Sequence, residues 1–316
     1  MTREKSASLN QSTVLVTGDS GGLASQIFQL FSQGGCKHLH SIDLRQPAHR
    51  LDGVTYHIGD LTDSNVMRRI FQDVKPNLVI HTASPKFDSP NHIMYRDNLE
   101  GTKSLIQVAK ESRTQSFVYM SSASVISDAK TDLRSADETY PIILGDRQPE
   151  FYLYTKALAG THIGDNRDLF DFTKSKNVAH GHYLAAEAPV KHQKELPLDS
   201  TKVDGEAFFI TNDEPRCFWD FTRLVWRYAG DTTRPDQLWV ITRPWVLLLA
   251  GIFEWVFWAL RLGEPPLTRT KVRLSCMTKY FSIAKVKKRL GYKPFVGLEE
   301  GLRQAVEDCV LRQKTS

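Results

Sequence analysis

The sequence predicts an α/β fold built on a doubly wound parallel sheet, with a smaller C-terminal cap. Five short apolar runs alternate with helix-like stretches, which is typical of strands whose two faces are covered by helices. At 316 residues with 41% hydrophobic residues, the chain is also long enough to bury a large core. After about Gly160 the alternation becomes irregular, which predicts the cap. The five runs expected to form strands are 14–17, 38–43, 54–58, 78–82 and 117–120.

The elements fall into three segments. Residues 1–12 form a polar tail without the apolar core of a signal peptide, so we expect the fold to begin on the cytosolic side of a membrane. Residues 13–160 carry the five strands and their helices. Residues 161–316 complete this domain and form the cap. The elements expected there are a helix over 178–188, a strand over 207–210 and a helix over 219–228.

One apolar stretch of the cap, residues 245–262, is close to the shortest length that can span a bilayer. Glu254 in its middle and Arg261 near its end favour a helix that lies in a membrane interface, or one that lines an apolar pocket. A charged residue at a bilayer centre is costly, whereas an interfacial helix can keep Glu254 on its wet face. We therefore expect the chain to associate with a membrane surface without crossing it.

The turn after the first strand is a candidate phosphate-binding site. Gly18, Gly21 and Ala24 form a Gly-x-x-Gly-x-x-Ala turn, whose small side chains let backbone amides and a helix N-terminus approach a pyrophosphate. The second strand ends at Asp43, where a carboxylate can hold both ribose hydroxyls and would repel a 2′-phosphate. These residues predict an NAD(P)-binding, Rossmann-type domain that prefers NAD. Arg45, two residues later, leaves NADP as the second choice.

A Tyr-x-x-x-Lys pair supplies a candidate catalytic base. Tyr152 and Lys156 would share one face of a helix, so the ammonium can lower the pKa of the phenol while it binds the nicotinamide ribose. Tyr152 would then act as a general base toward an alcohol. Tyr154 cannot take this role, because Leu158 stands four positions after it.

Together these motifs resemble the extended short-chain dehydrogenases/reductases, and within them the 3β-hydroxysteroid dehydrogenase/isomerase family with its fungal sterol-4α-carboxylate 3-dehydrogenases (decarboxylating). The resemblance covers nearly the whole chain. Besides the glycine turn and the Tyr-x-x-x-Lys pair, it rests on Asp60-Leu61, His81-Thr-Ala83-Ser84, Asn98-Leu-Glu-Gly101-Thr, Ser121-Ser122-Ala-Ser124, Leu169-Phe-Asp171-Phe-Thr, Asn177-Val-Ala-His180, Pro266-Leu-Thr-Arg269 and Leu290-Gly-Tyr292.

The resemblance implies a role for each matching residue. Tyr152 is the proton acceptor, Lys156 is its activator, and Ser122 is the hydroxyl that holds the substrate oxygen. The residues implied to bind the cofactor are Gly18, Gly21, Ala24, Asp43, Asp60, Leu61, Ala83, Ser84, Tyr152 and Lys156.

Other polar residues are assigned no chemistry. His81 and His180 are expected to be structural side chains, one beside a strand and one in a helix. Asp165, Asp168 and Asp171 recur at every third position, but the resemblance makes them loop and strand-end residues, so no metal is predicted.

Charge and cysteine content exclude further classes. The net charge of +5 is spread along the chain without a long basic block, so no nucleic-acid partner is expected. The four cysteines lie far apart without a Cys-x-x-Cys pair. This spacing predicts free thiols rather than a zinc site or a disulfide framework.

The implied reaction is NAD-dependent oxidation of a 3β-hydroxyl on a sterol or related terpenoid to the 3-ketone, with loss of carbon dioxide where a 4α-carboxylate is present. The signature does not separate this from oxidation of a C-3 alcohol in a fungal meroterpenoid or triterpenoid pathway. An alternative of another class is a catalytically dead nucleotide-binding or scaffold paralogue. The resemblance also implies the cytoplasmic face of the endoplasmic reticulum, with the cytosol as the alternative, and a homodimer.

The chain departs from this family after the Tyr-x-x-x-Lys helix. In the family a sixth strand and another helix follow, whereas here Gly160 is followed at once by Thr161-His-Ile-Gly164. About fifty residues are absent, and the loss of a central strand leaves buried backbone groups without partners. Two explanations are open. One is an exon-length omission from this chain, which the survival of the cofactor and catalytic motifs favours, and the other is a degenerate paralogue.

Overall fold

The computed structural model divides the chain into two compact units, and each is described by itself. The first unit takes in residues 1–121, 175–210 and 284–295, and the second takes in 122–174, 211–283 and 296–316. The domain boundary expected at residue 160 lies outside the described residues. The described residues are 9–18, 22–47, 49–86, 89–143, 161–163, 165–192, 202–232, 239–263, 265 and 267–315.

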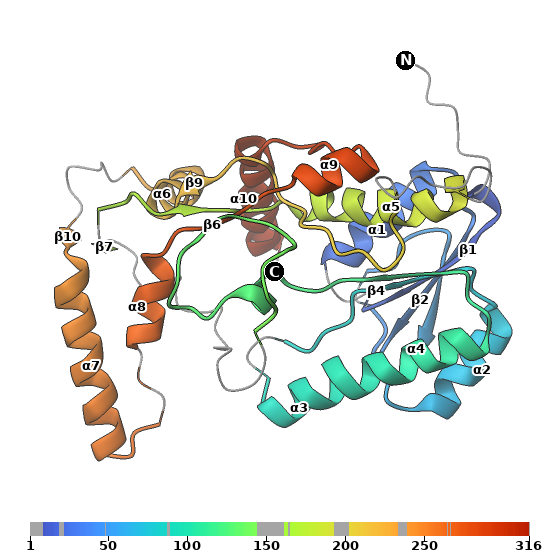
Figure 1. The fold of residues 1–316 in the computed structure, drawn as a ribbon, viewed down its shortest axis with the longest axis horizontal. Coiled ribbons are helices and arrows are strands. Elements are labelled where there is room, and N and C mark those ends of the chain that lie inside the picture. The colour runs from blue at the N-terminus through green and yellow to red at the C-terminus, as the bar shows by residue number, and fades with distance from the viewer. Residues whose placement is uncertain are drawn as a thin grey trace. The chain divides into compact units, whose positions relative to one another are not determined.

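A five-stranded parallel sheet forms the centre of the first unit, in the order β3-β2-β1-β4-β5 (Figure 1). Its strands are β1 (Thr13–Thr17), β2 (His38–Asp43), β3 (Val54–Ile58), β4 (Leu78–His81) and β5 (Ser116–Tyr119). The five predicted strands are confirmed to within one residue. The strand order reverses between β1 and β4, and this switch point is where open α/β sheets bind their ligands.

Helices cover both faces of this sheet (Figure 1). The helical elements of the first unit are η1 (Leu9–Gln11), α1 (Gly22–Gln33), α2 (Ser64–Val74), α3 (Asn91–Tyr95), the π-helix η2 (Arg96–Gly101), α4 (Thr102–Glu111), α5 (Ser175–His192) and α9 (Ala284–Leu290). Val14 and Val16 of β1 face one way and pack with α1 and α5. Leu15 faces the other way and packs with α2 and α4. The helix predicted over 178–188 is therefore confirmed, as part of α5.

Helix α2 illustrates how the sequence specifies these layers. Asp63 precedes the helix in an extended conformation, and its carboxylate accepts hydrogen bonds from the backbone amides of Asn65 (3.0 Å) and Val66 (3.1 Å). The apolar residues then recur at helical spacing and are buried against β1 and β4; they are Met67, Ile70, Phe71 and Val74. The helix ends at Lys75, whose φ of 49° is left-handed.

The sheet ends at β5 within the described part of the chain. All four residues of β4 are buried, whereas those of β5 are only partly buried and Tyr119 is 50% exposed. A strand with neighbours on both edges and helices on both faces would not have side chains exposed in this way. The exposure of β5 agrees with the absence of the sixth strand noted in the sequence.

The second unit contains two small sheets. One pairs β7 (Thr161–Ile163) with β10 (Trp239–Ile241), and the other has the order β6-β11-β8-β9. The strands of the second sheet are β6 (Leu133–Ala136), β8 (Leu169–Phe170), β9 (Arg216–Cys217) and β11 (Lys279–Phe281). The helices of this unit are η3 (Ala123–Ile126), α6 (Phe218–Tyr228), α7 (Arg243–Ala259), α8 (Arg269–Ser275) and α10 (Leu298–Thr315). Helix α6 confirms the prediction over 219–228.

The strand predicted over 207–210 is wrong, because these residues form no regular structure. Ile210 packs against α5, where its Cδ1 lies 2.7 Å from the position that a Cβ on Gly181 would take. The apolar run is thus explained by contact with a helix that has a glycine at this point, rather than by pairing in a sheet.

The apolar stretch 245–262 lies mostly within α7. Val246 and Ala250 are buried, and α7 exposes seven large apolar side chains: Trp245, Leu248, Leu249, Ile252, Phe253, Trp255 and Trp258. Glu254 keeps partial contact with water, because 26% of its side chain is exposed. Its carboxylate accepts hydrogen bonds from the backbone amide and the Nε of Arg269 in α8, both at 2.7 Å. Within the described residues, none of the helices is long and apolar enough to cross a membrane.

Candidate functional site

The carboxyl edge of the five-stranded sheet gathers the described residues that are candidates for cofactor binding. Thr17 of β1 pairs with Ile42 of β2 and with His81 of β4, and Asp43 pairs with Ile58 of β3. The residues that follow these strand ends therefore meet at one edge. They include Gly18, Asp60, Leu61, Ala83 and Ser84.

Position 18 requires a glycine, both because of its backbone conformation and because of the atoms around it. Its φ is 84°, and a Cβ built on it would lie 2.5 Å from the Cα of Ala83. Its amide donates to the carbonyl of Ile42 (3.0 Å), which fixes the start of the turn. Gly21 lies outside the described residues, and Ala24 is fully buried in the core beneath α1.

The N-terminus of α1 leaves room for an anion. The helix begins at Gly22, and nothing lies within 4 Å of the position that a Cβ there would occupy. First-turn amides have no partner within a helix, and the helix dipole favours negative charge at this end. The turn therefore fits a pyrophosphate bound through backbone amides.

Two carboxylates lie at the ends of β2 and β3. Asp43 is half-buried, and its Oδ1 accepts a hydrogen bond from the amide of Leu44 (2.6 Å). The Oδ1 of Asp60 accepts from the amide (2.8 Å) and the hydroxyl (2.7 Å) of Thr62, which folds the turn after β3. Ile58, at the end of β3, is an exposed apolar side chain beside these acids.

His81 is held at the switch point by two threonines. Its Nδ1 lies 2.7 Å from the hydroxyl of Thr17 and its Nε2 lies 2.8 Å from the hydroxyl of Thr102. Only 1% of the residue is exposed, and burial lowers its pKa to about 4. The ring is thus neutral near pH 7, and it stacks on Tyr119 at 5.3 Å between centroids.

The predicted catalytic residues are not brought together within the described residues. Tyr152 and Lys156 lie outside them. Ser122 belongs to the second unit, where it precedes η3, and its hydroxyl accepts a hydrogen bond from the amide of Ser124 (3.1 Å). The roles of Tyr152, Lys156 and Ser122 therefore stay predictions.

Sequence reasoning did not identify Thr17 and Thr102 as partners of His81, nor Leu44 and Ile58 as exposed apolar residues near Asp43. Leu44 is 53% exposed and Ile58 is 57% exposed. Their positions directly after β2 and at the end of β3 are the signal that could have identified them, because strand ends line the ligand-binding edge.

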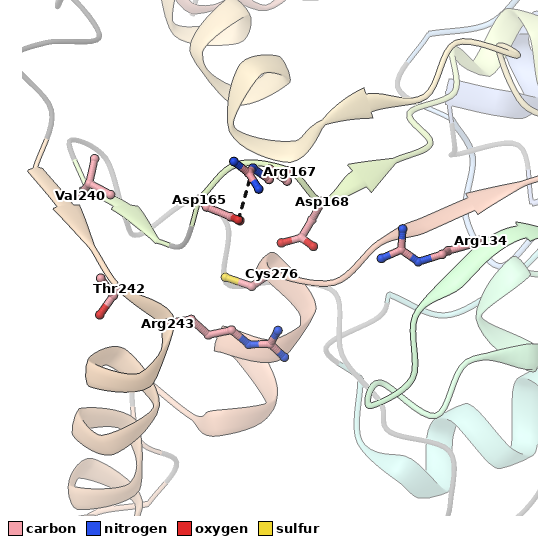
Figure 2. Close-up of a pocket in the computed structure, with 8 residues that line it drawn as sticks. All are labelled: Arg134, Asp165, Arg167, Asp168, Val240, Thr242, Arg243 and Cys276. Atoms are coloured by element: carbon pink, nitrogen blue, oxygen red, sulfur yellow. Dashed lines mark ion pairs between the residues drawn. The ribbon is translucent and has the colours of Figure 1, made fainter.

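The second unit has a charged cavity of about 760 Å³, shown in Figure 2. It is lined by Arg134, Asp165, Arg167, Asp168, Val240, Thr242, Arg243 and Cys276. Burial, together with Asp132 and Asp165, raises the pKa of Asp168. Asp171, by contrast, accepts a hydrogen bond from the amide of Phe281 (2.7 Å), and burial raises its pKa to about 6.

Two family models match the chain. Residues 14–163 match the NAD dependent epimerase/dehydratase family, and residues 153–240 match the 3-beta hydroxysteroid dehydrogenase/isomerase family. Among solved structures, the chain is similar to a UDP-glucose 4-epimerase from Thermotoga maritima, with a TM-score of 0.66 at 17% identity. It also resembles the Bordetella bronchiseptica enzyme WbmH in complex with NAD+, with a TM-score of 0.64 at 16% identity. Each likeness covers 96% of this chain, with 100% and 99% of the respective partner, and shows the fold.

Two curated relatives match this chain over nearly their whole length. The chain is 34% identical to the sterol-4-alpha-carboxylate 3-dehydrogenase ERG26, decarboxylating, of Saccharomyces cerevisiae, covering 93% of this chain and 97% of the relative. For the Schizosaccharomyces pombe enzyme of the same name the identity is 32%, covering 93% and 96%. The yeast alignment runs over 347 positions, whereas 93% of 316 residues is about 294. About 50 of its positions therefore have no counterpart in this chain, which equals the deficit noted in the sequence.

Proposed function

Since this chain belongs to the family of the sterol-4-alpha-carboxylate 3-dehydrogenases, we propose that it oxidises the 3β-hydroxyl of a 4α-carboxysterol or a related terpenoid to the 3-ketone, with NAD as the acceptor. A 3-ketone next to a 4α-carboxylate is a β-keto acid, which loses carbon dioxide through an enol without further help from the protein. The observation that carries the proposal is the carboxyl edge of the sheet, where the Gly18 turn, Asp43 and the open N-terminus of α1 fit a dinucleotide.

The residues present fit NAD better than NADP. A ribose with free hydroxyls can donate to the Asp43 carboxylate, whereas a 2′-phosphate would bring a second negative charge against it. Leu44 and Ile58 offer exposed apolar surface beside Asp43 for an adenine ring. NAD, when bound, accepts a hydride from the alcohol carbon.

The chain's own residues then handle the proton. Tyr152 takes the proton of the substrate hydroxyl, and Lys156 lowers the pKa of that phenol. Ser122 orients the alcohol by hydrogen bonding. These three roles are supported by the match of their positions to the family motifs.

A second candidate is a nucleotide-binding paralogue without catalysis, and one observation favours it. Strand β5 forms the edge of the described sheet and leaves Tyr119 half-exposed, at the place where the family's sixth strand would pair. Sequencing the transcript across the codons for Gly160 and Thr161 separates the cases. A message that encodes about fifty more residues there supports the enzyme, and a continuous message lacking them supports the paralogue.

Contact with a membrane surface is also part of the proposal, and α7 supports it. Its outward face combines tryptophan with aliphatic residues, which is the composition of interfacial helices. Because Arg269 binds the Glu254 carboxylate, this face carries no acidic side chain that would have to be desolvated. We place the protein on the cytoplasmic face of the endoplasmic reticulum, where its substrate would lie. The homodimer stays a prediction.

The experiment that tests the function combines binding and turnover. Calorimetric titration of the purified chain should give tighter binding of NAD than of NADP, and Asp43→Ala should narrow the difference. Reduction of NAD in the presence of a 4α-carboxysterol should be abolished by Tyr152→Phe, while Tyr154→Phe leaves it nearly intact. Binding of neither nucleotide, or equal losses in the two tyrosine variants, contradicts the proposal.

A further inference from the structure

One buried histidine connects three elements that meet at the cofactor edge. The ring of His81, at the end of β4, contacts the hydroxyl of Thr17 at the end of β1 through Nδ1 (2.7 Å). Its Nε2 contacts the hydroxyl of Thr102, the first residue of α4 (2.8 Å). His81 is 1% exposed and Thr17 is fully buried, so water cannot take the place of either partner. The His81 ring therefore joins the ends of β1 and β4 to the start of α4.

The direction of these hydrogen bonds follows from the backbone amide of Ala83. This amide can only donate, and it does so to Thr17 Oγ1 at 3.3 Å. Within the part of the chain that the structure describes, the other contact of Thr17 Oγ1 is His81 Nδ1, so the Thr17 hydroxyl proton points to Nδ1. Nε2 then carries the ring proton and donates it to Thr102. This arrangement needs a neutral ring, in agreement with the pKa of about 4 that burial gives His81.

The amide of Ala83 matters for the cofactor because Ala83 packs directly against the glycine turn. A Cβ placed on Gly18 would lie 2.5 Å from the Cα and 2.7 Å from the nitrogen of Ala83. The two backbones are thus in close contact, and a displacement of Ala83 changes the turn that fits the pyrophosphate. The shape of the cofactor edge therefore depends on the hydrogen bond that holds Ala83 to Thr17.

We propose that His81 is a positioning residue for NAD: its Nδ1 accepts the proton of the Thr17 hydroxyl and so keeps an oxygen lone pair directed at the Ala83 amide. Without this acceptor, the buried hydroxyl has to turn its proton elsewhere and loses its fixed direction toward Ala83. His81 itself does not touch the cofactor in this role, because the effect passes through Thr17 and Ala83 to the turn. The inference rests on the proposed function in one respect, which is that NAD occupies this edge.

The test separates the two nitrogens of the ring in the full-length chain. In His81→Asn the side-chain oxygen can take the place of Nδ1, whereas in His81→Gln the longer side chain brings its amide to the place of Nε2. Asn77→Leu is the control, because Asn77 Oδ1 accepts a hydrogen bond from the amide of Thr13 (2.9 Å) and so joins the same two strands at their amino ends. Denaturant unfolding measures stability, and calorimetric titration measures the affinity for NAD.

All three substitutions remove a hydrogen bond between elements, so each should lower the free energy of unfolding. His81→Gln should weaken NAD binding about tenfold or more, whereas His81→Asn should stay within about threefold of wild type. Asn77→Leu should leave the affinity unchanged. Nuclear magnetic resonance of wild type with 15N-labelled histidine should show a neutral His81 ring with its proton on Nε2. The His81 signal is identified by its absence from the His81 variants.

Four results would overturn the inference: a ring proton on Nδ1, equal NAD affinities of the two His81 variants, the same loss of affinity in Asn77→Leu as in His81→Gln, or no NAD binding by wild type. The resonance measurement decides the inference where a variant does not fold, since it needs wild type and one folded His81 variant only.

Failure of the proposed function is recognised separately, by reduction of NAD. If the affinities follow the expected order but a carboxysterol does not reduce NAD, the positioning role stands and the reaction does not. If a carboxysterol reduces NAD with the same KM for NAD in wild type and His81→Gln, the reaction stands and the positioning role does not.

Discussion

At the scale of single residues, Gly18 has the strictest steric requirement of the described cofactor edge. Alanine there would have to adopt a φ of 84° with its Cβ 2.5 Å from Ala83 Cα, so β1 and β4 would have to shift at their carboxyl ends. We expect Gly18→Ala to abolish NAD binding in calorimetry and to lower the free energy of unfolding by roughly 1–3 kcal/mol. Gly53→Ala is the matched control, since Gly53 has a φ of 79° but nothing within 4 Å of a Cβ. Loss of NAD binding in both variants would mean that general destabilisation, not the clash, is the cause.

His81 gives a pH dependence of known sign. Its pKa is about 4 in the folded chain and about 6.5 when unfolded, so the unfolded state binds more protons between these values. Stability is therefore lost as pH falls from about 6.5 toward 4, by about 3 kcal/mol for this residue. Asp171 acts in the opposite direction, because its pKa is raised to about 6.

Because His81 and Asp171 act in opposite directions, the effect of His81 has to be measured as a difference in stability between wild type and a His81 variant. Denaturant unfolding of wild type and His81→Gln at pH 7.5 and pH 4.5 should show that the variant loses less stability on acidification than wild type does. Equal losses in the two proteins would show that His81 does not carry this dependence.

At the scale of elements, the Asp63 cap of α2 should make a measurable contribution to the free energy of unfolding. Asp63→Ala removes the acceptor for two helix amides, so we expect the free energy of unfolding to fall by about 1 kcal/mol. Asp63→Ser keeps a side-chain acceptor and should recover most of this loss. If thermal or denaturant unfolding places both variants at the same stability, the cap contributes nothing.

Helix α7 should bind membranes through its exposed aromatic side chains. Replacement of Trp245, Trp255 and Trp258 by serine should reduce flotation of the chain with liposomes, because these side chains are 64%, 65% and 77% exposed. Control variants replace Tyr95, Tyr140 and Ile142, which are exposed apolar side chains elsewhere. Unchanged flotation in the tryptophan variant would show that α7 is not the anchor, and protease protection of residues after Arg261 on sealed microsomes would show that the stretch crosses the membrane.

The elements that could be predicted from sequence are those in which the residue types alone indicate burial or position. The apolar residues of β1 and β4 are buried between helices on both faces of the sheet, and Asp43 could be identified by its distance from the glycine turn. The strands of the second unit are two to four residues long, too short to show an alternation. The ion pair of Glu254 joins it to Arg269, which lies fifteen residues away in another helix. Likewise, the contact of His81 with Thr17 joins residues 64 positions apart, which local pattern does not reveal.

At the scale of the whole molecule, the missing segment should limit activity. Insertion of the corresponding residues of a curated relative between Gly160 and Thr161 should raise both the melting temperature and NAD-dependent turnover, because a sixth strand would pair with the exposed edge of β5. A flexible Gly-Ser insert of equal length is the control. An insertion that raises neither quantity would show that the chain is adapted to the shorter form.

The interleaving of the two units also determines the order in which the protein can fold during synthesis. The face of α1 that carries Ile27, Phe28 and Phe31 is covered by α5, where Tyr183 packs edge-on against Phe31 at 5.1 Å. Near the N-terminal end of α5, Asn177 accepts a hydrogen bond from the amide of Phe295 (2.8 Å). A ribosome must therefore release nearly the entire polypeptide before the nucleotide-binding unit can fold completely. Until then the apolar face of α1 stays exposed to solvent. Nascent chains of this protein should consequently engage chaperones that hold exposed apolar segments, for longer than nascent chains whose domains are contiguous in sequence.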